Sequence, residues 1–490
     1  MQFGQLLASA GLAPPLRGRQ VEIRDVQLDS RRCTGGSCFV AVRGAADDGH
    51  KYIPAALAAG ASAVVCQDLS ATDSAPALAV ASDGQGDAAA LAQALRGWPG
   101  RKLTCAAVTG TNGKTTVTYM IQSILAAAGC DAALLGTIRY ETGSATRPAA
   151  MTTPGPIELA ELTAEMVAAG RTHLVMEASS HALAQGRLAG LSFAAGVFTN
   201  LTGDHLDYHG DMDSYLAAKA RLFEQLPRGA RAIVNRDDPY GRDMAAASAA
   251  RVSWYAVDSP ADLWARMERM DADGSRFTLI ADGQERPVQT AIIGRHNVQN
   301  CLAAVGACLA LGVDLDDIVV ALGRLPRVPG RLERVPVAAS YSIFVDYAHT
   351  DDALQNVLTA LRPITRGRVI LVFGCGGDRD RTKRPRMAAV AEKLADVVIV
   401  TSDNPRGEPP EAIVKEILAG FSAKGRARAI VEIDRRAAIA AAIAEARASD
   451  VVLLAGKGHE TYQIIGSQRL DFDDVKVATE VATVAAGGAP

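Results

Sequence analysis

The sequence predicts an α/β protein of about three domains, and three observations support this fold class. The chain has 490 residues, and domains average roughly 150 residues each. Hydrophobic residues make up 49% and charged residues 21% of the chain, a balance typical of packed, soluble globular proteins. Short apolar runs typical of strands alternate with Ala-rich stretches typical of helices, which indicates mainly parallel sheets covered by helices.

Residues 1–100 predict a small N-terminal α/β domain. Its apolar runs are short, at residues 38–42, 61–66 and 77–81, and Gly- and Asp-rich turns separate them. The segment Arg96–Gly100 has the composition of a turn, so we expect a linker there.

Residues 101–330 predict a central domain with a mainly parallel sheet. A β-rich run at residues 103–108 leads into a glycine-containing loop and then into a helical stretch at residues 116–128. Further strands are expected at residues 173–176, 194–198 and 232–234, with helical patterns between them.

Residues 331–490 predict a C-terminal doubly wound, Rossmann-like domain. The segment Leu325–Gly330, which contains two prolines and a glycine, indicates the boundary that precedes it. Ala-rich helical segments separate the expected strands, which are residues 343–345, 369–373, 397–400, 430–433 and 451–454.

Charge and cysteine usage limit the class of protein. Lys and Arg total 51 and Asp and Glu total 54, and a net charge of −3 gives no basis for general nucleic-acid binding. The longest uncharged stretch, residues 296–313, is apolar only from Cys301 onward, so we expect a buried helix rather than a membrane span. Residues 1–15 contain no Lys or Arg, so we expect no secretory signal. The eight cysteines form no C-x-x-C pair, which favours buried thiols and a cytoplasmic location.

The segment Gly110–Thr116, with the sequence GTNGKTT, lies between a predicted strand and a predicted helix and is typical of a phosphate-binding loop. Glycine lets backbone N–H groups approach a phosphate closely, and the helix directs its positive end at the same group. Lys114 adds charge for the outer phosphates of ATP, and a Thr hydroxyl can ligate the accompanying Mg²⁺. The standard P-loop spacing is not met, because position 108 is Val. The alternative is a glycine turn ahead of an amphipathic helix.

Two further segments carry residues that could ligate a metal. Glu177 follows the strand expected at residues 173–176, where a carboxylate can face a metal on bound phosphates or can serve the structure alone. Asp204, His205, Asp207 and His209 lie close together in the sequence. Their spacing matches no fixed metal motif, so capping and hydrogen bonding in a loop remain an equal alternative.

Eight motifs, in one order, resemble those of the Mur ligases, the ATP-dependent amide-forming enzymes of peptidoglycan synthesis. The resemblance extends from about residue 28 to residue 463. The motifs are Asp29–Arg31, Gly110–Thr116, Glu177–His181, Asp204–Asp207, Gly294–Asn297, Pro329–Arg331, Asp346–His349 and Gly456–Glu460.

Within this family the chain resembles the MurE type, which adds the third residue of the stem peptide to UDP-N-acetylmuramoyl-L-alanyl-D-glutamate. The segment Asp403–Arg406, with the sequence DNPR, is similar to the form that selects meso-diaminopimelate over lysine. Diaminopimelate carries a second carboxylate at its far end, which the planar guanidinium of Arg406 can bind with two parallel hydrogen bonds. Lysine would leave Arg406 unpaired, which lowers its affinity.

The resemblance implies ATP as a substrate, two Mg²⁺ ions as cofactors and a reaction through an acyl phosphate. ATP activates a carboxylate, the amine of diaminopimelate attacks it and phosphate leaves, so cations at the developing negative charge are the main catalytic tool. The implied catalytic residues are Lys114, Glu177, His205 and Lys219, and the implied metal ligands are Thr115, Glu177 and His205. By resemblance Lys219 is a carbamate, although its position alone predicts an ordinary lysine on a helix surface.

The resemblance also implies three sets of binding residues. ATP is expected at Gly110, Thr111, Asn112, Gly113, Lys114, Thr115, Thr116, His296, Asn297, Arg331 and Asp346. The UDP-sugar peptide is expected at Leu28 and Ser30 in the first domain and at Thr152, Thr153, Ser179, Gln185 and Arg187 in the second. Diaminopimelate is expected at Arg379, Asp403, Asn404, Pro405, Arg406, Gly456 and Glu460. Met151 stands where some members carry Asn, which puts one hydrogen bond to the substrate in question.

Four alternatives remain. Folylpolyglutamate synthase resembles the Mur ligases in architecture, but Asp29–Arg31 in a separate N-terminal domain and the DNPR segment speak against it. A lysine-adding ligase differs only around Arg406. A nucleotide-binding switch would make no amide product, and a purely structural protein would not need polar residues at its strand ends. We expect small-molecule substrates, no nucleic acid, no membrane insertion and a monomer.

Overall fold

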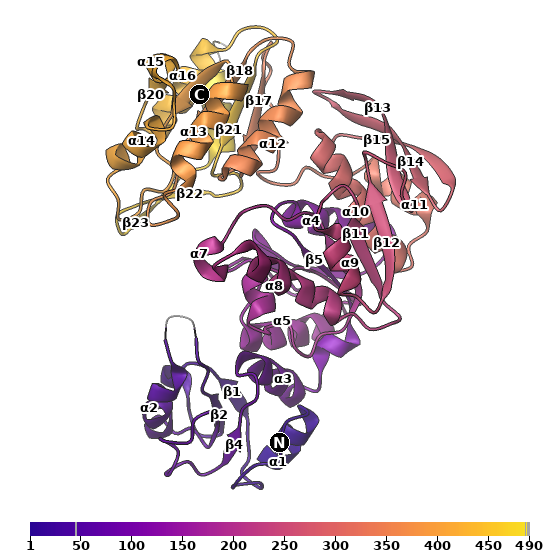
Figure 1. The fold of residues 1–490 in the computed structure, drawn as a ribbon, viewed down its shortest axis with the longest axis vertical. Helices are drawn as coiled ribbons and strands as arrows, with labels where there is room; N and C mark the ends of the chain where they lie inside the picture. The colour runs from indigo at the N-terminus through magenta and orange to yellow at the C-terminus, as the bar shows by residue number, and fades with distance from the viewer. Residues whose placement is uncertain (45–46, 486, 488–490) are drawn as a thin grey trace. The chain divides into compact units, whose positions relative to one another are not determined.

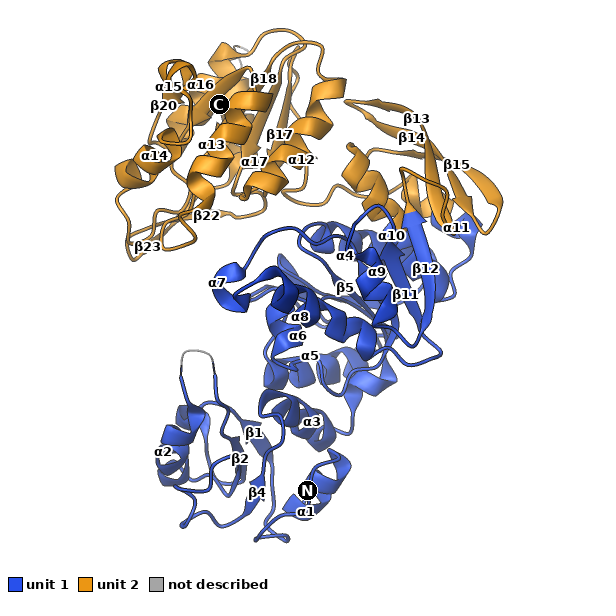
Figure 2. Cartoon of the chain, in the orientation of Figure 1, with its two compact units in different colours: residues 1–255, 303–318 blue, residues 256–302, 319–490 orange. Residues whose placement is uncertain are grey.

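The computed structural model describes residues 1–44, 47–485 and 487, and its main sheets lie one after another along the chain (Figure 1). The chain divides into two compact units, residues 1–255 with 303–318 and residues 256–302 with 319–490 (Figure 2). The α/β class with mainly parallel sheets is confirmed. The domain boundaries expected from the sequence stay predictions.

The N-terminal sheet has four strands, all parallel, in chain order. Its elements, with 3-10 helices written η, are α1 (Phe3–Ser9), β1 (Asp25–Gln27), η1 (Ser30–Arg32), β2 (Ser37–Val40), η2 (Gly49–Tyr52), α2 (Ile53–Ala58), β3 (Ala63–Cys66), β4 (Leu78–Val80) and α3 (Gln85–Leu95). Every residue of β2 and β3 is buried, because helices cover both faces of this parallel sheet. Phe3 and Leu91 pack on one face, and Phe39 and Ile53 pack on the other.

The expected linker at Arg96–Gly100 is a packed turn rather than a free connection. Trp98 has a left-handed backbone (φ +57°) and precedes η3 (Pro99–Lys102), in which Pro99 and Gly100 are buried. The side chain of Gln93 accepts a hydrogen bond from the Gly100 N–H over 3.1 Å. The chain therefore passes from the first sheet to the second through ordered, buried backbone.

The central sheet of the first unit is a run of parallel strands with an antiparallel extension. In spatial order its strands are β12 (Arg251–Ala256), β11 (Arg231–Asn235), β10 (Phe193–Phe198), β5 (Thr104–Thr109), β9 (His173–Glu177), β6 (Ala132–Leu135), β7 (Arg139–Glu141) and β8 (Thr146–Pro148). Because β5 pairs with both β9 and β10, the carboxyl ends of all three meet at one edge. Ligands of open α/β sheets bind at that edge.

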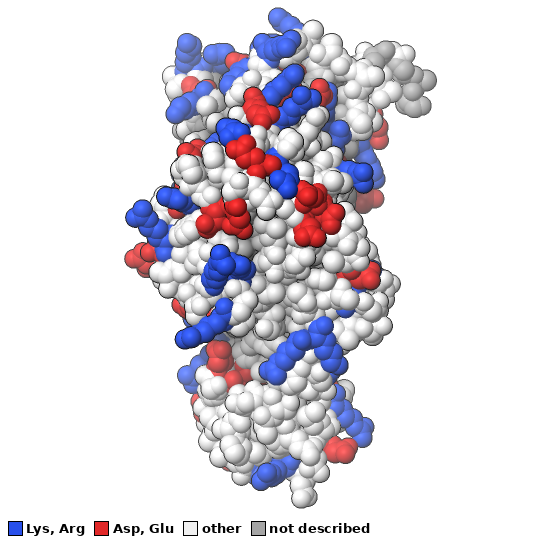
Figure 3. All heavy atoms as spheres, turned by 90° about the vertical axis from the view of Figure 1, so that its right-hand side faces the viewer, with Lys and Arg blue, Asp and Glu red and all other residues white. Residues whose placement is uncertain are grey.

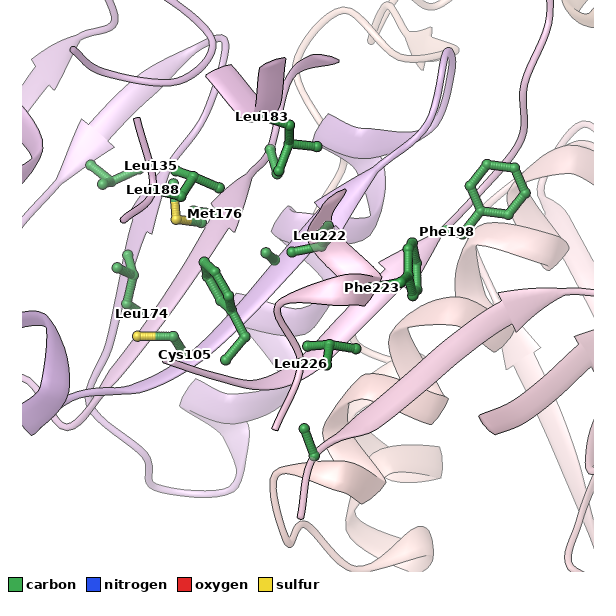
Figure 4. Close-up of a cluster of buried hydrophobic side chains, with 14 of the residues drawn as sticks. Cys105, Leu135, Leu174, Met176, Leu183, Leu188, Phe198, Leu222, Phe223 and Leu226 are labelled. Carbon is green, nitrogen blue, oxygen red and sulfur yellow. The ribbon is translucent and has the colours of Figure 1, made fainter. Parts of the chain in front are cut away.

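A hydrophobic core holds this sheet against its helices. The helices are α4 (Lys114–Ala127), α5 (Pro156–Ala168), α6 (Ser180–Ala184), α7 (Leu206–His209), α8 (Met212–Glu224) and α9 (Gly241–Ala246). Fully buried side chains of the core include Leu174 and Met176 of β9, Phe198 of β10 and Leu222 and Phe223 of α8 (Figure 4). Burial of each such side chain stabilises the fold by about 1.5–3 kcal/mol, so the strands that carry the site are rigidly held.

An antiparallel meander, which the sequence analysis did not predict, opens the second unit. It consists of β13 (Leu263–Asp271), β14 (Gly274–Ala281) and β15 (Gln284–Thr290). Asp282 and Gly283 join the last two strands with φ values of +47° and +79°, the Asp-Gly pattern typical of a tight hairpin. The next helices are α10 (Arg295–Ala310) and α11 (Leu315–Leu322). The buried helix expected from Cys301 onward is confirmed by α10, in which Cys301 and Cys308 are fully buried.

The C-terminal sheet is doubly wound, as expected. Its spatial order is β16 (Glu333–Arg334), β17 (Ser342–Asp346), β21 (Val451–Ala455), β18 (Val369–Phe373), β19 (Val397–Val400) and β20 (Ile430–Val431), all parallel except β16. Its helices are α12 (Asp351–Leu361), η4 (Arg362–Ile364), α13 (Lys383–Leu394), α14 (Pro410–Leu418), α15 (Ala423–Arg428), α16 (Arg435–Glu445) and α17 (Asp474–Ala485), and a hairpin of β22 (Tyr462–Ile465) and β23 (Gln468–Asp471) precedes α17. Leu354 and Met387 lie in one core and Ile439 and Ala478 in another, so the sheet is covered on both faces.

The cysteines and the helices agree with two other expectations. All eight cysteines are free thiols, and all are buried except Cys130, which is partly exposed. Among the described helices, none combines the length and the apolar character that a membrane span needs.

Candidate functional site

The phosphate-loop candidate connects the end of β5 to the start of α4. Gly110 has a φ of +149°, and a Cβ atom placed there would lie 1.8 Å from Thr199 Oγ1, so no other residue fits. Asn200, just beyond β10, holds the loop, because the Thr111 and Asn112 N–H groups donate to its backbone and side-chain oxygens over 2.9 Å each. The loop is therefore fixed before any ligand binds.

Lys114 lies within this loop at the start of α4. Its ammonium group donates hydrogen bonds to the carbonyl oxygens of Gly110 (2.8 Å) and Thr111 (2.9 Å). The positive charge and the N-terminal end of α4 thus lie together, which is the arrangement that binds phosphate.

Thr115 and Glu177 meet beside the loop. The Thr115 hydroxyl donates to Glu177 Oε1 over 2.9 Å, and both side chains are buried. Thr137, which follows β6, donates to the same carboxylate through its N–H (2.8 Å) and its hydroxyl (3.0 Å). Thr137 was not among the residues expected from the sequence, although it closely follows the short apolar run that forms β6.

The donor chemistry of Thr115 and Glu177 fits a magnesium ion. Both supply hard oxygen ligands next to the candidate phosphate loop, and Mg²⁺ usually takes one or two protein oxygens together with substrate phosphates. Within the described parts of the chain, no three His, Cys, Asp or Glu side chains converge on a common metal position.

His205 lies in a cluster of rings formed by residues 181, 205, 208, 209 and 215. Its ring centroid is 4.9 Å from that of His181 and 6.4 Å from that of Tyr215. It has a left-handed backbone (φ +55°) before α7, and its N–H donates to Asp204 Oδ1 over 2.9 Å. Burial lowers the pKa of His205, and the charges of Lys114 and Lys219 lower it further. A neutral imidazole is the form that binds a metal ion.

Lys219 is buried, which corrects the expectation of a helix-surface lysine. It is 1% exposed, and its Nζ lies 4.4 Å from the ring centroid of Tyr215, one turn earlier in α8. Burial lowers the pKa of Lys219 well below its usual value, and the charge of Lys114 adds to this effect. Lys219 lies in the site because it falls on the buried side of the amphipathic helix α8. Lysine as a residue type does not indicate this position.

The residues expected to bind the UDP-sugar peptide in the central domain form one network. Thr153 donates to Ser179 Oγ over 3.1 Å, and Arg187 donates to the carbonyl of Thr153 (3.2 Å) and to Gln185 Oε1 (2.7 Å). Thr152 lies 3.1 Å, oxygen to oxygen, from Thr137, which joins this network to Glu177. Arg187 also contacts the sulfur of the exposed Met151 at 3.8 Å.

Leu28 and Ser30 lie apart from that network, in the N-terminal sheet region. Ser30 is 9% exposed and begins η1, which Asp29 caps by accepting from the Arg31 N–H over 3.0 Å. Leu28 packs against the N-terminal core.

The residues expected to bind ATP are divided between the units. His296, Asn297, Arg331 and Asp346 belong to the second unit, whereas residues 110–116 belong to the first. Asp346 accepts from the N–H groups of Leu332 (2.7 Å) and Ala348 (2.8 Å), and burial raises the pKa of its carboxyl. The Arg331 guanidinium lies 4.9 Å from the ring centroid of Tyr347. Burial lowers the pKa of His296 to about 4.

Most of the expected diaminopimelate residues converge at the carboxyl ends of β19 and β21. Asn404 Nδ2 donates to Glu460 Oε2 over 2.8 Å, and a Cβ on Gly456 would lie 2.6 Å from Asp403 Oδ2. Pro405 is buried, and Arg406, with a left-handed backbone (φ +51°), donates to the carbonyl of Gly377 over 2.9 Å. Arg379 is exposed and donates to the carbonyl of its neighbour Asp378.

Three domain profiles match consecutive parts of the chain. The Mur ligase family catalytic domain matches residues 22–96, the Mur ligase middle domain matches residues 108–308, and the Mur ligase glutamate ligase domain matches residues 330–458. This chain belongs to the Mur ligase family.

Individual relatives of this Mur ligase agree over its full length. The UDP-N-acetylmuramoyl-L-alanyl-D-glutamate--2,6-diaminopimelate ligase of Gloeobacter violaceus is 45% identical over 482 residues, 98% of each chain. A solved structure of a ligase with that name is 32% identical, with a TM-score of 0.72 over 99% of this chain and 100% of its own. Folylpolyglutamate synthase from Mycobacterium tuberculosis, solved with ADP and AMPPCP, is 19% identical, with a TM-score of 0.63 over 81% of this chain and 94% of its own, a likeness of fold alone.

The three-domain α/β fold of the Mur ligases is thereby confirmed for this chain. Three residues outside the sequence motifs of this Mur ligase also contact the motif residues. Thr137 and Asn200 contact the motif residues directly, and Tyr215 bonds to Thr111 over 3.2 Å between their oxygens. They lie beyond strand ends or on a helix, in segments that motif spacing does not mark.

Proposed function

We propose that this Mur ligase adds meso-diaminopimelate to UDP-N-acetylmuramoyl-L-alanyl-D-glutamate at the expense of ATP, in cytoplasmic peptidoglycan precursor synthesis. The observation that carries the proposal is the convergence of the DNPR segment with Glu460, in which Asn404 and Glu460 are bonded over 2.8 Å. Full-length relatives at about 45% identity bear the name of this ligase, which supports the same substrate class.

In this proposal the phosphate loop activates a carboxylate. Lys114 and the backbone N–H groups at the N-terminal end of α4 bind the phosphates of ATP, within the loop of residues 110–116, and offset the negative charge that builds on the transferring group. Thr115 and Glu177 would hold one Mg²⁺ and His205 would help to hold a second, and these ions would supply further positive charge to the phosphates. Glu177 keeps its orientation because Thr137 donates to both of its oxygens.

Lys219 is the proposed site of carbamylation. A lysine must lose its proton before its nitrogen can attack carbon dioxide, and burial favours the neutral amine. The product is an anion, which can support cations at a place where an ammonium group would repel Lys114.

The two remaining substrates are assigned to separate sets of side chains. Thr152, Thr153, Ser179, Gln185 and Arg187 offer hydroxyls, an amide and a guanidinium to the anionic UDP-sugar peptide, together with Leu28 and Ser30. His296, Asn297, Arg331 and Asp346 are the proposed ATP-binding residues of the second unit. For diaminopimelate, Glu460 pairs with an ammonium group, and Arg406 and Arg379 pair with carboxylates, aided by Asp403, Asn404, Pro405 and Gly456.

The cellular location, the absence of a nucleic-acid partner and the oligomeric state are proposed on other grounds. Free, mostly buried thiols fit the reducing cytoplasm. Figure 3 shows positive and negative side chains interspersed over one face, an arrangement unlike the single-sign patch of a nucleic-acid binder. Large exposed hydrophobic residues such as Leu16, Val320 and Val484 lie on different elements, which fits the proposed monomer. Sedimentation at micromolar concentration tests that state.

The proposed function is tested by phosphate release from ATP with UDP-N-acetylmuramoyl-L-alanyl-D-glutamate in the presence of meso-diaminopimelate, L-lysine or no amino acid. We expect release that requires the nucleotide-sugar peptide and strongly prefers diaminopimelate. A preference for lysine would keep the ligase and refute the role given to Arg406. Release that ignores the nucleotide-sugar peptide would refute the proposal, and folate would then be tested as the acid.

A further inference from the structure

The β22–β23 hairpin is hydrogen-bonded to three residues of the DNPR segment, Asp403, Asn404 and Arg406. Gln463 donates through its side chain to the carbonyl of Asp403 over 2.7 Å, and the Ile464 N–H donates to Asn404 Oδ1 over 2.9 Å. The Arg406 N–H donates to the carbonyl of Ile464 (3.1 Å), and the Gly466 N–H donates to the carbonyl of Arg406 (2.8 Å). The left-handed backbone of Arg406, which costs energy in a non-glycine residue, is held by these two bonds.

Lys457 joins the same hairpin to Glu460. Its side chain is fully buried, its ammonium group lies 3.1 Å from Glu460 Oε2, and it donates a hydrogen bond to the carbonyl of Tyr462 in β22. A buried ammonium is tolerated only where it is paired and hydrogen-bonded, and both conditions are met here.

Glu460 has one oxygen engaged and one oxygen left. Asn404 and Lys457 both donate to Oε2, whereas none of the described residues donates to Oε1. The charge of Glu460 acts on Tyr347 beyond β17, on Arg435 of α16 and on Tyr462 of β22. Lys457 contacts the carboxylate itself.

We propose that Lys457 and Gln463 are positioning residues for the incoming amino acid: Lys457 keeps Glu460 turned so that Oε1 receives the amino acid's ammonium group, and Gln463 fixes the backbone that presents Arg406. This inference rests on the proposed function, because it names two further determinants of the same amino-acid site. The hairpin thereby sets the separation between an anionic group and a cationic group, which is the feature that distinguishes amino acids of different length and charge.

The test compares Lys457→Met and Gln463→Leu with the unaltered enzyme by steady-state phosphate release. Both changes keep the buried volume and remove the polar contacts. The matched control is Gln468→Leu, because Gln468 lies on the partner strand of the same hairpin and is exposed. The amino acid is meso-diaminopimelate, or L-lysine if the unaltered enzyme prefers it, so failure of the proposed substrate changes the probe and not the comparison.

We expect Lys457→Met to raise the KM for the amino acid by about tenfold or more, the loss of a charge-assisted hydrogen bond, and Gln463→Leu to raise it by about three- to tenfold, the loss of a neutral one. The KM values for ATP and the nucleotide-sugar peptide should stay within about twofold.

An unchanged amino-acid KM in either folded variant would overturn the corresponding half of the inference. An equal rise in all three KM values would indicate general loosening and would overturn it as a whole. Circular dichroism and thermal melting show whether each variant is folded, and calorimetric binding of the same amino acid supplies a second measurement at low turnover. If Lys457→Met does not fold, the comparison of Gln463→Leu with Gln468→Leu decides the positioning role of the hairpin.

Discussion

The hydroxyl of Thr115 donates to Glu177 Oε1 over 2.9 Å, which joins the first turn of α4 to the last residue of β9. The two residues are 62 positions apart in the chain. Their pairing brings an oxygen from the phosphate-loop helix and a carboxylate from the neighbouring strand to one place, as a magnesium ion on bound phosphates requires.

Replacing Glu177 with Gln should raise the Mg²⁺ concentration needed for half-maximal activity by about 10- to 100-fold, because a neutral amide is a poorer magnesium ligand than a carboxylate. Titration of phosphate release against Mg²⁺ measures this effect. The control is Glu224→Gln, a change at an exposed position at the end of α8. Equal magnesium dependence in the two variants would contradict the assignment of Glu177.

Lys219 should carry a carbamate when the enzyme is supplied with bicarbonate. ¹³C NMR with labelled bicarbonate should show a carbamate signal that is lost in Lys219→Met and kept in Lys476→Met, a change at an exposed lysine of α17. The signal and the activity should both fall as the pH is lowered, because protonation of the Lys219 amine blocks its reaction with carbon dioxide. A fully active Lys219→Met enzyme would refute the role.

Replacing Arg406 with Ala should raise the KM for diaminopimelate by about 10- to 100-fold, the loss of a hydrogen-bonded ion pair, and should leave the KM for ATP nearly unchanged. Discrimination against L-lysine should fall at the same time. Arg366→Ala, at an exposed position between η4 and β18, is the matched control. If Arg406→Ala raises both KM values by the same factor, the argument from the second carboxylate fails.

Glu408 should make the folding stability of the protein depend on pH in the acidic range. Arg384, which is fully buried, donates to both oxygens of Glu408 (2.8 and 2.9 Å) and, with the Asp378 N–H, lowers the pKa of this carboxyl to about 2. A lowered carboxyl pKa contributes stability above the unfolded value of about 4.3, and that contribution is lost as the pH falls toward 2.

Melting temperatures measured between about pH 5 and pH 2 should therefore fall less steeply in Glu408→Gln than in the unaltered protein, since the variant has already lost the ionised pair. Glu411→Gln, at an exposed position in the first turn of α14, should keep the original slope. A slope unaltered by Glu408→Gln would show that this pair does not govern acid sensitivity.

The sequence predicted the parallel strands well, because their apolar runs are continuous and are bounded by turns. The strands at residues 369–373 and 397–400 match the structure residue for residue. The meander at residues 263–290 escaped prediction, since its polar and apolar residues alternate only weakly and many of its side chains are exposed. Arg96–Gly100 was read as a linker from composition alone, and tertiary packing orders it.

The candidate site was predictable where a motif lies beside a strand end, as at Lys114 and Glu177. Lys219 was different, because only the three-dimensional packing of α8 shows that its side chain is buried. Thr137, Asn200 and Gln463 contact the expected residues through hydrogen bonds between segments far apart in the chain. Such contacts have no local pattern, so a single sequence does not reveal them.

The way that Asn200 and Thr199 hold the phosphate loop has a consequence for biosynthesis. Asn112 bonds to Asn200 across 88 positions, and the two residues follow β5 and β10, which pair directly with each other. Long-range pairings form late and slowly, because much chain must be ordered before they are made. A ribosome-bound chain that has exposed only residues 1–170 would therefore carry the complete GTNGKTT motif without the Asn200 contacts that hold it, so we expect nucleotide binding to begin only after residue 200 has emerged.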